Sequence, residues 1–214
     1  MDFIFNPQRE HFIKWIDRRI KQQRDILIIG DYGVGKSAFI KEIKKKYPKA
    51  MVVNPLGSIC QLLGEACGVS EVAYWQKTKY IQQLKDHPRL IIIDEAQHLR
   101  RDFYPYLKML SDYGNTLVLS GLVELADLLK ERHPDILSRM MRMTLEPIEA
   151  DEFKRHLSGV FEPDAIKVIN GKASCMREMV EIIDDCLLHL EETKQPMVTE
   201  DIAYSIAHAE ELGD

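Results

Sequence analysis

The stretch from Ile26 to Ile43 reads ILIIGDYGVGKSAFIKEI, an apolar run followed by a glycine-rich turn and an amphipathic segment. It matches the pattern G-x-x-x-x-G-K-[ST] at Gly30, Gly35, Lys36 and Ser37. The pattern predicts a strand, a loop whose backbone N–H groups bind phosphate, and a helix whose N-terminal dipole adds to the binding. The residues that we expect to bind a nucleotide are Gly30, Asp31, Tyr32, Gly33, Val34, Gly35, Lys36, Ser37 and Ala38.

An acidic pair, Asp94 and Glu95, directly follows the apolar run LIII at 90–93. A strand that ends there places Asp94 beside the phosphate loop, where it would hold Mg²⁺ together with Ser37. Glu95 is then the natural candidate to orient the attacking water, and Lys36 would contact the β- and γ-phosphates. The alternative for Glu95 is an acid at the start of a helix, stabilised by the helix dipole. The pair favours ATP hydrolysis and argues against a small-molecule kinase, which has to exclude water.

Strand and helix patterns alternate through the first two thirds of the chain. Apolar segments typical of buried strands lie within 25–30, 49–55, 89–95, 115–121 and 141–148. Segments that suit helices lie near 37–47, 56–67, 72–86, 102–113 and 123–132, after a first helix marked by Phe12, Ile16 and Ile20. This alternation predicts an α/β fold: a parallel five-stranded sheet with helices on both faces.

The strand patterns stop after Pro147. Four helical segments follow, near 150–158, 163–169, 175–192 and 199–212. We therefore expect two domains: a nucleotide-binding α/β domain over 1–147 and a small helical lid domain over 148–214.

The formal net charge of -5 conceals an asymmetry between two parts of the chain. Residues 1–145 hold 23 Lys and Arg against 17 Asp and Glu, whereas residues 146–214 hold 6 against 17. A basic part suggests a polyanionic partner, and the alternative is solvated faces that happen to differ. Two basic groups stand out, the first with Arg18, Arg19, Lys21 and Arg24 and the second with Lys41, Lys44, Lys45, Lys46 and Lys49. Lysines at the end of a helix are also favoured by its dipole alone.

Several protein classes are disfavoured by the sequence. No window reaches 18 apolar residues and the N-terminus lacks a basic and then apolar signal, so we expect a cytoplasmic protein without a membrane partner. The histidines show no H-E-x-x-H spacing, which disfavours a structural zinc site. No C-x-x-C pair occurs, so we expect reduced core thiols at Cys60, Cys67, Cys175 and Cys186.

With these motifs in order, the chain resembles the AAA+ ATPases over essentially its whole length. PQREHF at 7–12 resembles the N-terminal box of the initiator-type members. DEAQHL at 94–99 and LVLSGLVELADLL at 117–129 resemble the transposition-regulator and secretion-ATPase group, which includes Mu B, TniB, TnsC and ExeA. The resemblance implies that ATP joins subunits and that hydrolysis releases them.

The resemblance also implies roles for residues outside the phosphate loop. Pro7 and Arg9 would border the adenine, and the alternative for Arg9 is a surface cation at a helix start. Ser120 would be sensor 1, which contacts the γ-phosphate or the attacking water. Leu122 stands where many relatives carry Asn, Gln or Thr, so the alternative for Ser120 is a buried serine at a strand end.

Three arginines complete the site that the resemblance implies. Arg139 lies where this branch carries an arginine finger for the neighbouring subunit's site, with Arg142 as the runner-up. The alternative for both is a surface arginine before a strand. Arg177 matches the sensor-2 arginine at the start of a lid helix, a position where the dipole disfavours a cation that has no phosphate partner. If Arg139 acts in trans, assembly controls hydrolysis.

We therefore predict an ATP- and Mg²⁺-dependent ATPase that assembles on double-stranded DNA as a homo-oligomer, either a ring or a filament. Contacts to the DNA backbone would be independent of base sequence. The protein would regulate transposition target selection by recruiting or activating a transposase. The alternatives are a helicase loader or replication initiator, a secretion-type ATPase with a protein client, and a signalling switch that binds protein. The basic part favours DNA over the last two.

Overall fold

The computed structural model describes residues 7–69, 74–148 and 157–209, with the side chains of Pro7, Gln8 and Tyr74 left out. No helix within these ranges is long and apolar enough to cross a membrane. The chain is divided into two compact units, which are described separately. One includes Pro7–Asp31 and Lys36–Leu145, and the other includes 32–35 and the described residues from Glu146 onward. The sequence-based limit between 147 and 148 stays a prediction.

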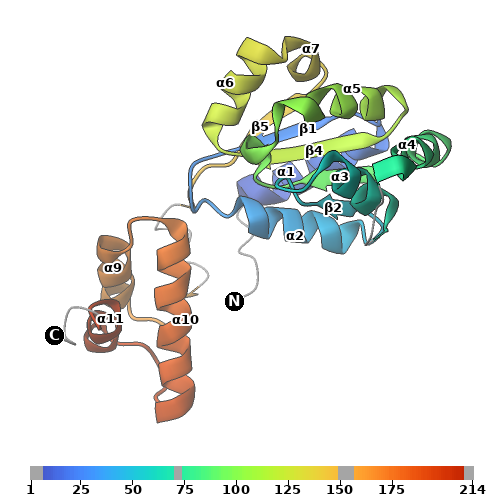
Figure 1. Cartoon of the computed structure of the whole chain (residues 1–214). Coiled ribbons are helices and arrows are strands. Elements are labelled where there is room, and N and C mark those ends of the chain that lie inside the picture. The colour runs from blue at the N-terminus through green and yellow to red at the C-terminus, as the bar shows by residue number, and fades with distance from the viewer. Residues whose placement is uncertain (1–6, 70–73, 149–156, 210–214) are drawn as a thin grey trace. The chain divides into compact units, whose positions relative to one another are not determined.

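The larger unit is built on a parallel five-stranded sheet with the strand order β2-β3-β4-β1-β5 (Figure 1). The strands are β1 (Ile26–Ile29), β2 (Met51–Val53), β3 (Leu90–Ile93), β4 (Thr116–Gly121) and β5 (Met141–Thr144). Each lies in a segment where the sequence predicts a strand, and the predicted α/β fold is confirmed. Strands β1 and β4 are buried along their whole length because helices cover both faces of the sheet.

The two faces of the sheet carry different helices (Figure 1). One face packs against α3 (Ile59–Cys67), α4 (Lys77–Asp86), α5 (Tyr104–Asp112), α6 (Val123–Arg132) and α7 (Pro134–Leu137). The other face carries α1 (Pro7–Lys21) and α2 (Lys36–Lys46), which bury Ile16, Phe39 and Ile43. Both layers follow from apolar side chains at helical spacing, which the sequence shows directly.

Some helix ends differ from the predictions. Helix α3 begins later than predicted because Ser58 caps it: Ser58 Oγ accepts from the Gln61 backbone N–H at 3.2 Å, and Gln61 Oε1 accepts from the Ser58 N–H at 2.6 Å. Before α4 the described chain forms a 3₁₀ turn at Tyr74–Gln76. Helix α7 was not predicted, because four residues are too few for a helical periodicity to appear.

The smaller unit contains α9 (Pro163–Lys172), α10 (Met176–Thr193) and α11 (Glu200–Ala207). They correspond to three of the predicted helices, whereas the fourth, near 150–158, falls almost entirely outside the described residues. The helices enclose a core of their own that includes Phe161, Ile183, Cys186 and Val198. All four cysteines are free thiols; Cys60, Cys67 and Cys186 are buried, whereas Cys175 is only partly buried and is therefore not a core residue.

Candidate nucleotide site and basic face

Three of the predicted site segments meet at the carboxyl ends of the strands, which we call the carboxyl edge of the sheet. Gly30 follows β1, Asp94 follows β3, and Ser120 is the penultimate residue of β4. These strands are neighbours in the order β3-β4-β1 and all run parallel, so their carboxyl ends lie side by side. Open α/β sheets bind ligands at this edge, at the point where the direction of the crossovers changes. The fold therefore brings the phosphate loop and the acidic pair to one place.

The phosphate loop, residues 30–37, has the backbone that its motif requires. Gly33 and Gly35 have φ angles of +77° and +86°, in the left-handed region that favours glycine. Lys36 is buried at the start of α2, and its Nζ donates to the carbonyl oxygens of Gly30 at 3.0 Å and of Asp31 at 2.8 Å. The ammonium group and the positive end of α2 thus lie at the loop, an arrangement that fits a phosphate.

The acidic pair leaves β3 through an unusual backbone. Asp94 is half-buried, and its Oδ1 accepts a hydrogen bond from the Glu95 N–H at 3.0 Å. Glu95 has φ +53° and ψ 40°, a conformation that costs a residue with a Cβ about 1–2 kcal/mol. Only the 3₁₀ turn Ala96–His98 follows, so the helix-dipole alternative for Glu95 lacks its helix. The Asp94 carboxylate and the Ser37 hydroxyl carry oxygen atoms of the kind that Mg²⁺ prefers as ligands.

Two polar site residues are fully buried. Ser120 lies opposite Ile28 of β1, and within the described part of the chain its Oγ makes no hydrogen bond. A buried hydroxyl without a partner costs about 1–3 kcal/mol, so a ligand or water that binds there would gain from it. Arg9 is completely buried in α1, and the alternative of a surface cation is therefore wrong.

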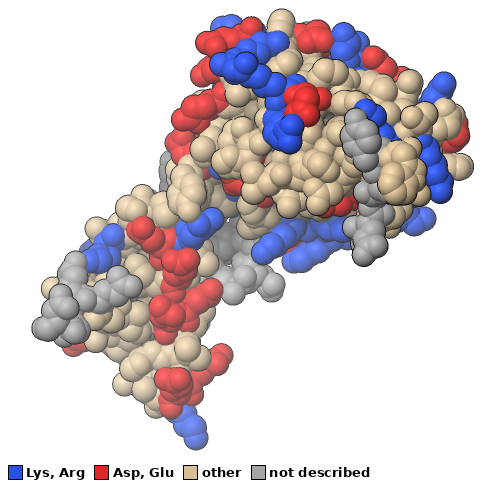
Figure 2. All heavy atoms as spheres, in the orientation of Figure 1, with Lys and Arg blue, Asp and Glu red and all other residues tan. Residues whose placement is uncertain are grey.

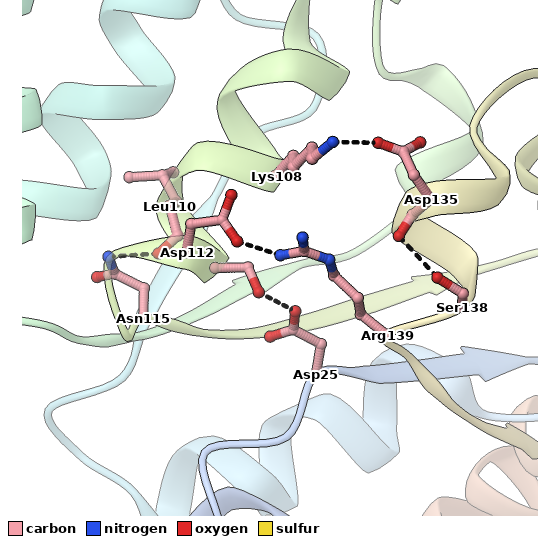
Figure 3. A network of polar contacts seen from close by, with 9 residues as sticks. Asp25, Lys108, Leu110, Asp112, Asn115, Asp135, Ser138 and Arg139 are labelled. Carbon is pink, nitrogen blue, oxygen red and sulfur yellow. Dashed lines mark hydrogen bonds and ion pairs between the residues drawn. The ribbon is translucent and has the colours of Figure 1, made fainter.

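Arg139 lies at the amino ends of the strands, which we call the amino edge of the sheet (Figure 3). It precedes β5, whose first residue, Met141, donates from its N–H to the Asp25 carbonyl just before β1. The Arg139 guanidinium is paired with the Asp112 carboxylate. A four-residue strand spans about 13 Å, so the backbone of Arg139 is more than a strand length from the carboxyl ends of the strands, where the phosphate loop lies. Arg142 lies within β5 and is exposed.

A buried carboxyl group lies next to this ion pair. Asp25 accepts hydrogen bonds from Ser111 Oγ at 2.5 Å and from the Leu117 N–H at 2.8 Å. Burial raises the pKa of Asp25, while these two hydrogen bonds and the charge of Arg139 oppose the rise. Asp25 thus ties the start of β1 to α5 and β4.

Arg177 lies in the first turn of α10, where the sequence places it. Its Nη1 donates to Tyr32 Oη at 2.6 Å, and its guanidinium carbon lies 4.9 Å from the centroid of the Tyr32 ring. Both residues belong to the smaller unit and both side chains are exposed. The ring contact compensates for the unfavourable position of a cation at a helix start.

The two basic groups of the sequence are joined through Asp17. Its carboxylate is paired with Lys21 of α1 at 2.8 Å and with Lys46 of α2 at 3.0 Å, and it accepts a hydrogen bond from Tyr47 Oη. The hydrogen bonds from Lys21, Tyr47 and Lys46 hold the pKa of Asp17 well below its usual value. Asp17 therefore fixes the end of α1 against the end of α2.

This junction forms a surface that we call the α1–α2 basic face. Figure 2 shows lysine and arginine side chains along α2. The exposed members of the face are Arg18, Lys21, Arg24, Lys41, Lys45, Lys46 and Lys49. Within the described residues no ion pair forms at Arg18, Arg24, Lys41 or Lys49. Four unneutralised cations thus remain available to an anionic partner.

One polar residue of the site was missed by the sequence reasoning. Gln97 donates from Nε2 to Glu95 Oε2 at 2.5 Å, and its Oε1 accepts from the Leu122 N–H at 3.3 Å. The signal was present in the motif DEAQ, where an amide follows the glutamate by two residues. Its contact with β4 could not be seen there, because it joins segments 25 residues apart.

Comparison with known proteins places this geometry in a family. The family model described as "AAA domain" matches residues 18–129. Among solved structures, Cdc6p from Pyrobaculum aerophilum is 13% identical with a TM-score of 0.68, and the Aeropyrum pernix ORC1 protein in complex with DNA is 17% identical with a TM-score of 0.71. The Thermotoga maritima RuvB Holliday junction branch migration motor is 15% identical with a TM-score of 0.63.

The coverage of these matches is uneven. They cover 92%, 98% and 97% of this chain in the order given, but only 66%, 66% and 70% of the solved chains. The chain thus spans about two thirds of the length of the proteins it resembles in structure. A comparison with curated protein sequences found no significant match. At these identities the structural likeness shows the fold.

Proposed function

The chain belongs to the AAA domain family and is an ATPase that uses ATP and Mg²⁺, and on this basis we propose that it is an ATP-dependent switch that assembles on duplex DNA. The observation that carries the proposal is the α1–α2 basic face, where Arg18, Arg24, Lys41 and Lys49 lack ion-pair partners within the described residues. Such cations bind phosphates and release condensed counterions, which makes binding independent of sequence and sensitive to salt.

We assign the hydrolytic roles to residues at the carboxyl edge of the sheet. Bound ATP supplies the phosphoanhydride bond, and Mg²⁺ neutralises charge on its phosphates. Lys36 contacts the β- and γ-phosphates, while Ser37 and Asp94 hold the metal. Glu95 orients and polarises the water, and Ser120 senses the γ-phosphate.

Two arginines are assigned to the nucleotide in the same way. Arg9, which is buried in α1, borders the adenine together with Pro7. Arg177 is assigned as the sensor of the lid unit, and its hydrogen bond to Tyr32, a residue of the nucleotide-binding motif, supports this assignment.

The position of Arg139 supports a proposal of assembly. The residue lies at the amino ends of the strands, so its side chain cannot reach the nucleotide site of its own subunit, which lies at their carboxyl ends. It can instead contribute to the nucleotide site of a neighbouring subunit. An arginine supplied in trans stabilises the charge of the transition state. The proposal therefore includes a homo-oligomer whose formation switches hydrolysis on, and Arg142 is the second choice for this role.

The test is binding to a fluorescent random-sequence duplex with ATP and Mg²⁺, with ADP, and without nucleotide, at several salt concentrations. We expect cooperative binding with ATP that falls steeply as salt rises. Neutralising the basic face (Arg18, Arg24, Lys41 and Lys49 to Gln) should reduce the slope of log K against log salt by up to about 3–4, from about 0.9 per lost phosphate contact.

A matched variant controls for net charge alone. It neutralises four exposed cations outside the basic face: Lys79, Lys85, Lys130 and Arg132. This variant should keep the affinity and salt slope of the unmodified protein to within about one contact. If no duplex binds in any nucleotide state, the DNA proposal fails and the client is a protein.

For the biological role we propose regulation of transposition, in which the DNA-bound oligomer recruits or activates a transposase. The support is the pair of boxes at 94–99 and 117–129, which resemble the transposition-regulator group. This role needs no preferred DNA sequence. A selection from a random duplex library should then enrich no motif.

A second candidate is a replication initiator or helicase loader. It is favoured by the likeness to Cdc6p and to the ORC1 protein, the latter solved in complex with DNA. An initiator with a defined binding site would enrich one motif in the same selection. That outcome would replace the transposition role and leave the ATP-dependent DNA switch in place.

A further inference from the structure

A short polar bridge joins the ends of β3 and β4. Gln97 lies in the 3₁₀ turn after the acidic pair, and its side chain reaches in two directions. Its Nε2 donates to Glu95 Oε2 at 2.5 Å, and its Oε1 accepts from the Leu122 N–H at 3.3 Å. Leu122 directly follows β4, two residues after Ser120. One amide therefore contacts both the carboxylate of Glu95 and the backbone that leaves the Ser120 strand.

The chain provides space for this amide. A Cβ at Gly121 would lie 2.5 Å from Gln97 Oε1 and 2.7 Å from Leu125 Cδ2, so these two side chains would have to shift if residue 121 carried a side chain. The absence of a side chain at residue 121 therefore leaves room for the Gln97 carbonyl in the position observed. The amide is also half-buried, so its hydrogen bonds are less exposed to competition from water.

The backbone at Glu95 does not by itself fix the position of the Glu95 carboxylate. Glu95 is in the left-handed conformation, and its N–H is bonded to Asp94 Oδ1 at 3.0 Å. These two features fix where its Cα lies, but a glutamate side chain retains three rotatable bonds. In the described structure it is the Gln97 amide that contacts the carboxylate at the far end of those bonds.

We propose that Gln97 is a positioning residue for hydrolysis: it holds the Glu95 carboxylate in register with the end of β4. This inference rests on the proposed role of Glu95 in orienting water. Gln97 Nε2 restrains the Glu95 carboxylate, which polarises water. Gln97 Oε1 accepts from the Leu122 N–H and so holds the amide against the segment that carries Ser120. A change at the end of β4 would thereby be transmitted to Glu95. Gln97 acts through Glu95 and has no contact with nucleotide in this scheme.

The experiment measures single-turnover ATP hydrolysis and ADP affinity of the full chain. Gln97→Met keeps the length and approximate volume of the side chain but removes both hydrogen bonds. We expect the hydrolysis rate to fall about 10-fold or more, since a misplaced catalytic group loses up to about 100-fold. ADP affinity should stay near that of the unmodified protein, because neither bond involves nucleotide. The melting temperature should fall only slightly, because the one backbone N–H that loses its acceptor, that of Leu122, is only part-buried.

The matched control is Gln82→Met. Gln82 donates from Nε2 to Asp86 Oδ1 at 2.8 Å on exposed α4, so this variant loses the same kind of bond at a remote place. It should leave the hydrolysis rate unchanged. Gln97→Glu keeps an acceptor for the Leu122 N–H but sets a second carboxylate against Glu95, and should be as slow as Gln97→Met.

A double variant separates this inference from the role of Glu95. If Gln97 acts through Glu95, adding Gln97→Met to Glu95→Gln should lower the residual rate less than twofold further. A full 10-fold further loss, an unchanged rate in Gln97→Met alone, or a faster one would overturn the positioning role. Full activity of Glu95→Gln would instead refute the proposed role of Glu95 itself.

Discussion

The guanidinium of Arg139 is paired with the carboxylate of Asp112, across the amino edge of the sheet and away from the phosphate loop (Figure 3). Both side chains are partly exposed. An exposed ion pair of this kind contributes little to stability. Within one subunit, Arg139 is therefore held by Asp112. The pair is weak enough for the guanidinium to leave Asp112 and bind a nucleotide phosphate of a neighbouring subunit.

The proposed role of Arg139 in trans can be tested by mixing two inactive variants. Arg139→Ala retains an intact phosphate loop, and Lys36→Ala retains an intact Arg139. Each alone should lose hydrolysis, by an amount on the order of 10³-fold for an arginine finger. A mixture should recover activity, because some interfaces then combine the intact loop of one subunit with the intact arginine of the other.

The control for that experiment is the neighbouring arginine of β5. Arg142→Ala should hydrolyse ATP normally on its own. The role in trans would be assigned to Arg142 if Arg142→Ala were inactive alone and recovered activity when mixed with Lys36→Ala. Failure of every mixture to recover activity would refute action in trans for both residues.

Replacing Glu95 should separate ATP binding from ATP hydrolysis. Glu95→Gln keeps the shape of the side chain but cannot take up a proton from water, so we expect hydrolysis to fall by about 10²–10⁴-fold with little change in ATP affinity. Under the proposed switch, its complex with duplex DNA should outlast that of the unmodified protein in ATP. Dissociation from DNA after a high-salt challenge measures this, and an unchanged lifetime would contradict release by hydrolysis.

The junction at Asp17 predicts a defined pH dependence of stability. The folded protein holds the pKa of Asp17 well below that of the unfolded chain, so the carboxylate stabilises the fold above about pH 4 and ceases to do so as pH falls further. Asp17→Asn should therefore lose roughly 1 kcal/mol or less of unfolding free energy at pH 7 and at pH 5. Urea unfolding should show the difference shrinking only below about pH 4.

A control for Asp17 is Asp164→Asn. Asp164 is paired with Lys167 one turn away on α9, and both side chains are mostly exposed. This variant should unfold like the unmodified protein at pH 7, at pH 5 and below about pH 4. A difference between Asp17→Asn and the unmodified protein that narrowed already between pH 7 and pH 5 would contradict the lowered pKa.

The buried amide of Asn115 should tolerate no charge. Its Oδ1 accepts from the Arg89 N–H at 2.9 Å, and its Nδ2 donates to the carbonyls of Leu84 at 3.1 Å and Leu110 at 2.9 Å. Asn115→Asp replaces the donor with a carboxylate oxygen that faces two carbonyl oxygens. We expect a loss of about 3–5 kcal/mol in unfolding free energy at pH 7, as for a buried charge without a partner.

The sign of the pH effect distinguishes this variant from a simple packing defect. Burial would raise the folded-state pKa of the new carboxyl group, so the lost stability should return in part as pH falls and the group takes up a proton. Asn54→Asp, at an exposed residue whose Oδ1 accepts from the Leu56 N–H, should change stability by less than about 0.5 kcal/mol. A loss for Asn115→Asp that is independent of pH would show that charge is not the cause.

The local features were visible in the sequence because they depend on neighbours in the chain. The phosphate loop needs only glycines, a lysine and a serine at fixed spacing, and the structure shows the two positive φ angles that such a loop requires. The buried strands could be located because their apolar runs are continuous when helices cover both faces. Even the polar bridge of Gln97 to Glu95 spans only two residues, although its importance was not apparent there.

Features that join distant segments were decided by the tertiary structure alone. The strand order β2-β3-β4-β1-β5 brings the ends of β1, β3 and β4 together, and the parallel pairing of β5 with β1 puts Arg139, which precedes β5, at the amino ends of the strands. The bond from Tyr47 to Asp17 and the bond from Leu122 to Gln97 likewise join residues 30 and 25 positions apart. Sequence by itself determined the loop, the acidic pair and the alternation of strands and helices, since torsion and periodicity are local. Which side chains meet depended on how the sheet is ordered, because that order is set by packing the whole core.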